Sequence, residues 1–135
     1  MHYPLSMSIS EQLESAVNDV RSRVPEIEGA VIVDMDGLII AISRDMPELA
    51  EDQIELGGSM AVALSAGERI TTELDRGRFK ELLVKGEKGY VYLTGVGDDK
   101  ILALLAKPEV KLGMLFLEAK RLSQMLDELF KVGEL

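Results

Sequence analysis

The sequence predicts an α/β (α+β) fold: a three-layer α/β/α sandwich in which helices cover both faces of one five-stranded antiparallel sheet. In chain order the 135 residues suggest a helix, a β-hairpin, a long helix, three strands and a final helix. The last three strands, at 78–85, 89–94 and 100–106, are joined by connections too short for a crossover, so neighbours must run antiparallel. The runs LIIAI (38–42) and ILALLA (101–106) are apolar at consecutive positions, which is typical of strands covered on both faces.

The first helix is predicted for residues 8–24, after an N-terminal tail at 1–7 and at the start of a single domain at 8–135. Ser8 and Glu11 have the spacing of a capping box, in which each side chain accepts a hydrogen bond from the other residue's backbone N–H. Apolar residues then recur at helical spacing until Pro25 ends the run.

A β-hairpin is predicted from the β-branched segments 29–35 and 38–43, which flank Asp36 and Gly37. Asp-Gly favours a two-residue type I′ turn, in which both central residues have positive φ. We therefore interpret Asp36 and Gly37 as structural turn residues.

The long helix is predicted for residues 47–74 and has two distinct faces. The apolar stripe expected to face the sheet consists of Leu49, Leu56, Met60, Ala63 and Ile70. The roughly opposite face is small and nearly uncharged, and consists of Ile54, Gly58, Ala61 and Ser65. Because the outer face of a monomer's helix is normally charged, the small face predicts close contact with another backbone. A helix broken at the glycine pair 57–58 is the alternative.

The strand at 78–85 has the charge pattern of a sheet edge. Its residues Arg78, Lys80, Glu81 and Lys85 are charged, yet the strand is long enough to pair with another chain. Pro108 ends the last strand, and an amphipathic helix is predicted from about 109 to 130.

Charge and composition exclude several classes of partner. A net charge of −9 repels nucleic acid phosphates and anionic bilayers, and the longest apolar run is far too short to span a membrane. Cysteine is absent, so thiolate chemistry and disulfides are excluded. We expect a cytoplasmic protein without nucleic acid partners or direct membrane insertion.

The stretch Asp34-Met35-Asp36-Gly37 resembles the first motif of the magnesium-dependent haloacid dehalogenase-type phosphatases, and GVGDD, with Asp98 and Asp99, resembles their distal acidic motif. In such an enzyme Asp34 would be the nucleophile and Asp36 the general acid/base. That chemistry requires a parallel sheet with several crossovers, which this chain has no room for. Turn residues are therefore the favoured interpretation and the phosphatase the alternative. The sequence has no other catalytic motif, and we predict no catalytic residue, cofactor or metal site.

Three segments together resemble the Roadblock/dynein light chain family, including its archaeal and bacterial members: EGAVIVDMDGLIIAIS, GYVYLTGVGDDKILALLA and VKLGMLFLEAKRL. The resemblance spans residues 27–126 and implies a five-stranded antiparallel sheet between one long helix and the two terminal helices. It also implies a dimer in which the edge strand and the long helix meet their copies.

Family members are noncatalytic platforms that bind Ras-like small GTPases and adjust their nucleotide cycle, or that attach complexes to motors or membranes. The resemblance therefore implies a homodimeric, noncatalytic regulator of a small GTPase. A scaffold that pairs with a paralogous Roadblock protein is the alternative. The residues expected at dimer or partner contacts are Ile54, Gly58, Ala61, Ser65, Arg78, Phe79, Lys80 and Glu81.

Overall fold

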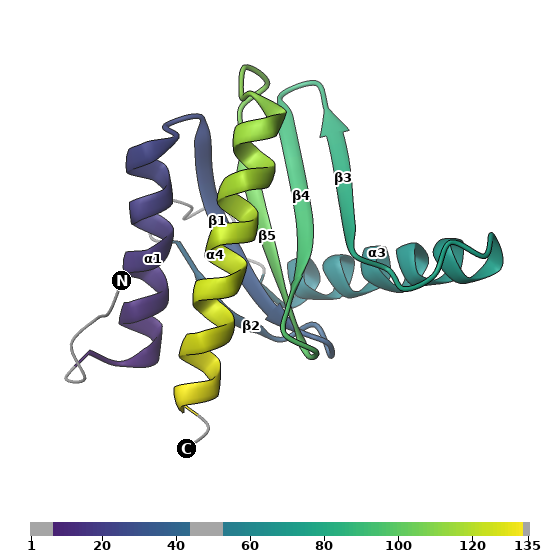
Figure 1. Cartoon of the computed structure of the whole chain (residues 1–135), viewed down its shortest axis with the longest axis horizontal. Coiled ribbons are helices and arrows are strands. Elements are labelled where there is room, and N and C mark those ends of the chain that lie inside the picture. Colours follow the sequence, from purple (N-terminus) through teal and green to yellow (C-terminus); the bar gives the residue numbers. More distant parts are fainter. Residues whose placement is uncertain (1–6, 44–52, 134–135) are drawn as a thin grey trace.

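The chain folds around a five-stranded sheet with the strand order β2-β1-β5-β4-β3, in which every neighbouring pair runs antiparallel (Figure 1). The structure is a computed structural model that describes residues 7–43 and 53–133 of the 135. The strands are β1 (Ile27–Asp34), β2 (Ile39–Ile42), β3 (Glu81–Gly86), β4 (Gly89–Val96) and β5 (Lys100–Ala106), and the helices are α1 (Ile9–Arg23), α3 (Gln53–Glu73) and α4 (Leu112–Gly133). The predicted antiparallel sheet is confirmed.

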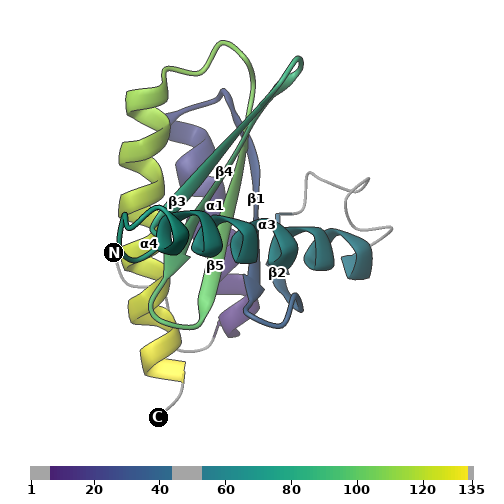
Figure 2. The same cartoon turned by 90° about the vertical axis from the view of Figure 1, so that its right-hand side faces the viewer.

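Helices cover both faces of the sheet. The two terminal helices, α1 and α4, lie side by side on one face, and α3 crosses the other face (Figure 1, Figure 2). Helix α1 packs over β1 and β2, whereas α4 packs over β4 and β5. The predicted three-layer arrangement is therefore confirmed, and β3 is the strand that neither terminal helix covers.

Each face of the sheet has its own apolar core. Between the sheet and the terminal helices, Ile32 and Leu104 of the central strands are fully buried against residues such as Leu115. On the α3 face, Val33 and Ile101 pack with Met60. The unbroken apolar run of β5 is explained by its central position, but the run in β2 is not, because β2 is an edge strand whose residues are all half-buried.

The N-terminus of α1 has the predicted capping box. The Ser8 Oγ accepts a hydrogen bond from the Glu11 N–H at 3.1 Å, and the Glu11 carboxylate accepts one from the Ser8 N–H at 3.4 Å. At its other end, Arg23 of α1 donates to the Glu118 carboxylate of α4 at 2.9 Å, and Arg121 donates to the same carboxylate at 2.9 Å. The buried charge of Glu118 is thus compensated by two guanidinium groups, of which that of Arg23 joins α1 to α4.

The β1–β2 turn differs from the predicted two-residue type I′ turn. Gly37 has φ +86°, but Asp36 is not among the positive-φ residues of the described chain. The Asp34 carbonyl accepts a bond from the Gly37 N–H, and the Asp34 N–H donates to Leu38. The loop therefore contains three residues, 35–37, with glycine at its left-handed position, which is the next most common hairpin connection.

Helix α3 continues through its glycine pair, and Gly57 has a defined packing role. A Cβ atom on Gly57 would lie 1.8 Å from the carbonyl oxygen of Gly37, so the helix backbone lies directly against the β1–β2 turn. The buried stripe continues through Met60, Leu64 and Gly67. The assignment of Ile70 to this stripe was wrong, because its side chain is 56% exposed. Leu49 lies outside the described residues.

Two element boundaries also differ from the sequence prediction. Strand β3 begins at Glu81 and not at Arg78, because residues 78–80 pair with no strand and Phe79 instead packs against α3. Helix α4 begins at Leu112 and not near Glu109. Residues 107–110 form a turn in which the Val110 N–H donates to the Lys107 carbonyl.

We predict that Gly57→Ala destabilises the fold by about 1–3 kcal/mol, because the added methyl group overlaps the Gly37 backbone and α3 must move away from the turn. The matched control is Gly113→Ala, at the second residue of α4 and away from the small face of α3. An added Cβ meets no atom within 4 Å there, so this variant should gain about 0.5–1 kcal/mol from helix propensity. Urea unfolding of both variants provides the measurement, and equal shifts of the same sign would contradict the proposed packing.

Candidate interaction surface

The outer edge of β3 is the first part of a candidate interaction surface. Strand β3 ends the described sheet and pairs only with β4, so its other edge presents unpaired backbone groups. Val84, on the α3 side of this strand, is 47% exposed. An exposed edge of this kind can pair with another strand.

The C-terminal part of α3 extends past β3 beyond the sheet (Figure 1). This overhang carries Ile70, and Leu74 directly follows its last residue; their side chains are 56% and 63% exposed, and Val62 is 70% exposed further back on the helix. Together with Ala66, these residues recur every four positions and form an exposed apolar stripe along the helix. This stripe was not predicted from the sequence, although the i, i+4 spacing of its apolar residues is present there.

On the same face of the sheet, no helix of the described residues covers the end that lies away from α3. Helix α3 lies against the β1–β2 turn, whereas the β3–β4 turn is at the opposite end of the strands. Near that turn a hollow of about 540 Å³ is lined mainly by apolar groups, among them Val84, Val91 and Leu105. The overhang and the hollow are therefore two apolar surfaces on opposite sides of one free strand edge.

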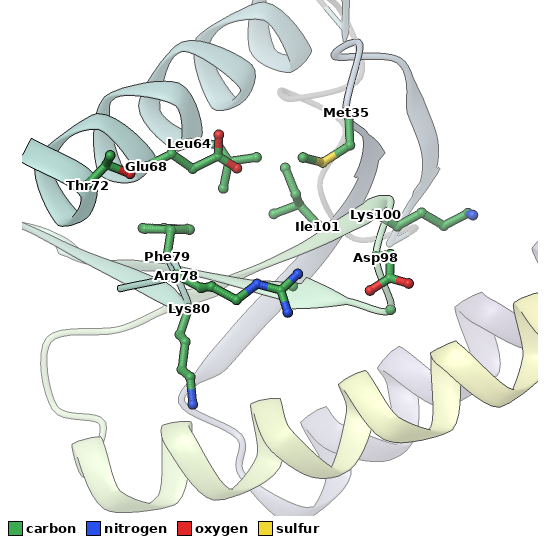
Figure 3. Close-up of a pocket in the computed structure, with 12 residues that line it drawn as sticks. Met35, Leu64, Glu68, Thr72, Arg78, Phe79, Lys80, Asp98, Lys100 and Ile101 are labelled. Atoms are coloured by element: carbon green, nitrogen blue, oxygen red, sulfur yellow. The ribbon is translucent and has the colours of Figure 1, made fainter. Parts of the chain in front are cut away.

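A second hollow, a cleft of about 650 Å³, lies between α3, residues 78–80 and the turns that follow β1 and β4. Arg78 extends into the cleft (Figure 3). Phe79 packs against α3, since a Cβ atom on Gly67 would lie 2.4 Å from its ring. Glu68 and Asp98 place carboxylates at the same cleft.

The residues predicted at partner contacts take different positions. Gly58 and Ser65 are exposed on α3, Ala61 is half-buried, and the side chain of Ile54 lies outside the described residues. Phe79 is half-buried and is turned toward the protein's own core. Arg78, Lys80 and Glu81 are exposed beside the free edge, and the structure does not bring them into one cluster with the α3 residues.

Glu81 is held in place on the edge strand by Tyr92 of β4, whose hydroxyl donates a hydrogen bond to its carboxylate. Burial of the phenol, with the hydrogen bond and the negative charge of Glu81, raises the pKa of Tyr92 well above its usual value. The phenol therefore continues to donate to Glu81 even in alkaline solution, where an ordinary tyrosine loses its proton.

The carboxylate of Asp34 stabilises the β1–β2 turn. It accepts hydrogen bonds from the backbone N–H groups of Asp36, at 2.9 Å, and Leu38, at 3.0 Å. The β4–β5 turn lies at the same end of the sheet, yet the described residues contain no group of three acids or histidines placed to hold a metal ion. With the antiparallel topology, this gives the phosphatase alternative no support.

We predict that Asp34→Ala lowers the free energy of unfolding by about 1–2 kcal/mol, because two backbone donors lose their charged acceptor. Asp36→Ala removes an exposed carboxylate from the same turn and is the matched control, with an expected change below about 0.5 kcal/mol. Thermal and urea unfolding of both variants measure the difference. An Asp36 effect as large as the Asp34 effect would refute this division of roles.

An antiparallel sheet between helices, with a free edge and exposed apolar side chains beside it, defines a three-layer α+β domain. The chain belongs to the Roadblock/LC7 domain family, whose model matches residues 16–106. Two relatives from Methanocaldococcus jannaschii, the uncharacterized proteins MJ1340 and MJ0310, are each 31% identical over 105 residues, or 77% of this chain and 88% of the relative.

The fold is also that of solved Roadblock-type structures. Myxococcus xanthus MglB has a TM-score of 0.80 at 19% identity, over 90% of this chain and 96% of that protein. A structure described as MglB with tetrameric arrangement has a TM-score of 0.78 at 20% identity, over 93% and 92% of the two chains. No helix in the described part of the chain combines the length and apolar character needed to cross a bilayer.

Proposed function

We propose that this protein is a noncatalytic, dimeric platform that binds a Ras-like small GTPase and regulates its nucleotide cycle. Membership of the Roadblock/LC7 family supports the GTPase part of the proposal. The dimeric part is carried by one observation, the apolar overhang of α3 and the apolar hollow on either side of the free β3 edge. A tetrameric arrangement of MglB, which has the same fold, supports self-association.

The proposed dimer follows from the symmetry of these surfaces. Two β3 strands that pair antiparallel across a two-fold axis join the two sheets into one. The overhang of each α3 then extends over the other copy's sheet, at the end its own α3 leaves uncovered. Ile70 and Leu74 of one copy would cover Val84 and Val91 of the other, so each contact occurs twice.

The small α3 face predicted from the sequence belongs to the same proposal. Gly58 and Ser65 are exposed, and Gly58 leaves open space where a Cβ would be. Two antiparallel α3 helices on one sheet would lie side by side, and small residues allow their backbones to approach. Arg78, Lys80 and Glu81, beside the edge, are proposed to contact the partner copy or the GTPase.

A platform without catalytic groups regulates a GTPase only through unequal affinity for its two nucleotide states. A protein that binds the GTP and GDP forms equally shifts neither population. A tenfold preference corresponds to about 1.4 kcal/mol, which a few additional contacts to one conformation of the GTPase can supply.

A scaffold that pairs with a paralogue is the second candidate. It is favoured by the two equally similar relatives that occur together in one organism, Methanocaldococcus jannaschii. In such a heterodimer the same overhang and hollow would be used, but the two chains would differ.

We predict that Leu74→Glu converts the dimer into a monomer at micromolar concentration, because it places a carboxylate against the apolar hollow of the other copy. Gly58→Glu tests the small face of α3 in the same way. Leu117→Glu, at a 49% exposed position of α4 on the opposite face, is the matched control and should leave the mass unchanged. Light scattering gives the mass, and circular dichroism checks folding.

A wild-type monomer would contradict the homodimer. If the same chain then forms a defined complex on co-expression with a paralogous Roadblock protein, the scaffold alternative is supported. A dimer that persists in both α3 variants would show that the interface lies elsewhere.

We predict that the immobilised protein retains a Ras-like GTPase from source-cell lysate in only one nucleotide state. The capture is run in parallel with GDP and with a nonhydrolysable GTP analogue, and mass spectrometry identifies the retained proteins. Purified GTPase is then tested for changes in its hydrolysis and exchange rates. Equal retention in both states, or no GTPase at all, would refute regulation of the nucleotide cycle.

A further inference from the structure

The α4 side of β3 is the side opposite Val84 and the apolar hollow, so it is separate from the contacts proposed for the α3 overhang. Helix α4 packs over β4 and β5, so no helix of the described chain covers this side of β3. Leu83 is half-buried there and packs at the margin of the core under the terminal helices. The exposed side of β3 is therefore apolar at its centre.

Three lysines surround this apolar centre. Lys85 lies on the α4 side of the sheet, where its Nζ is 5.9 Å from the centre of the Tyr90 ring. Lys80, at the margin of the cleft, extends toward the side where α4 lies (Figure 3). Both are exposed, and neither forms a salt bridge with another residue of the described chain.

The flank of α4 that faces β3 supplies the third lysine. Phe116 lies on this flank, since its ring centre is 5.1 Å from that of Tyr92, and Ser123 on the same flank donates to the Gly95 carbonyl. Lys120 is one helical turn after Phe116 and therefore lies between these two contacts. It is exposed and makes no salt bridge within residues 7–43 and 53–133.

We name this surface the lysine face: Lys80, Lys85 and Lys120 with Leu83 and Phe116. Its one acidic neighbour on β3, Glu81, is already hydrogen-bonded to Tyr92. A cationic surface of this kind contrasts with a chain whose net charge is −9.

The dimer proposed above would turn two lysine faces into one trough, so this step rests on the proposed function. Its floor would be two β3 strands about 4.8 Å apart. Its walls would be the two α4 helices, each with Phe116 and Lys120 on the flank that faces the trough. The two-fold axis places a copy of each lysine on the other side of the trough. Lysines therefore surround its apolar floor.

We propose that the lysine face binds an extended acidic segment of a partner protein, with aliphatic side chains seated against Leu83 and Phe116. The positive face attracts carboxylates, whereas the rest of the molecule repels them. A membrane surface fits less well, because a flat bilayer does not enter a trough between two helices and the net charge of −9 opposes its approach.

The test uses a synthetic, fluorescein-labelled peptide of glutamates with interspersed leucines, and the same peptide with glutamine in place of glutamate. Fluorescence anisotropy measures binding to the full chain at low and at moderate salt. We expect the glutamate peptide to bind, the glutamine peptide to bind at least tenfold more weakly, and the affinity to fall as salt rises.

Lys85→Ser with Lys120→Ser should weaken binding about fivefold, since each exposed charge contact is worth up to about fivefold in affinity. Lys107→Ser with Lys111→Ser removes the same charge from exposed positions between β5 and α4 and is the matched control, with a change below twofold. Equal losses in the two double variants would show only diffuse attraction and would overturn the proposal. Binding to phosphatidylserine vesicles but not to the peptide would overturn it as well.

Light scattering on the same samples separates this proposal from the dimer. A monomeric chain that still binds the peptide through Lys85 and Lys120 supports the lysine face while the dimer fails. A dimer that does not bind the peptide overturns the lysine face and leaves the proposed dimer intact.

Discussion

The backbone contact between Gly37 and Gly57 fixes where α3 lies on the sheet. The exposed apolar surfaces beside β3 depend on that position. Because a Cβ atom on Gly57 would lie 1.8 Å from the Gly37 carbonyl oxygen, α3 can lie this close to the β1–β2 turn only with glycine at that point. The helix is thereby held at one end of the strands, and its 21 residues carry it past β3. The contact between Gly37 and Gly57 thus accounts both for the apolar hollow near the β3–β4 turn and for the apolar overhang of α3.

Sequence reasoning predicted the elements well where a local pattern determines them. The capping box at Ser8 and Glu11 and the antiparallel meander of β3, β4 and β5 are set by neighbours in the chain, and both are present. The assignment of Ile70 to the core failed for a physical reason. Helical spacing gives the face on which a residue lies, but it does not tell where along the helix the sheet ends.

The difference between a local pattern and tertiary packing also explains why the β1–β2 turn and the candidate interaction surface differ from the sequence prediction. Asp-Gly indicates a hairpin, but the alternative three-residue loop became favourable because Asp34 accepts two backbone hydrogen bonds within it. Gly57 and Gly67 are read from the sequence as small residues, yet their roles depend on Gly37 and Phe79, which approach them from other elements. The family resemblance implied a partner contact for Phe79 as part of the edge strand, whereas tertiary packing turns its side chain toward α3.

Strand β3 therefore has three surfaces with different chemistry. Its free edge offers backbone hydrogen bonds, its α3 side is apolar, and its α4 side carries Lys85 beside Leu83. If an acidic partner binds the trough of the dimer more tightly than it binds a single lysine face, it stabilises the dimer by mass action. By the reciprocity of linked equilibria, dimerisation raises the affinity for that partner by the same factor. The same strand would then couple self-association to partner binding without any change in the fold of the monomer.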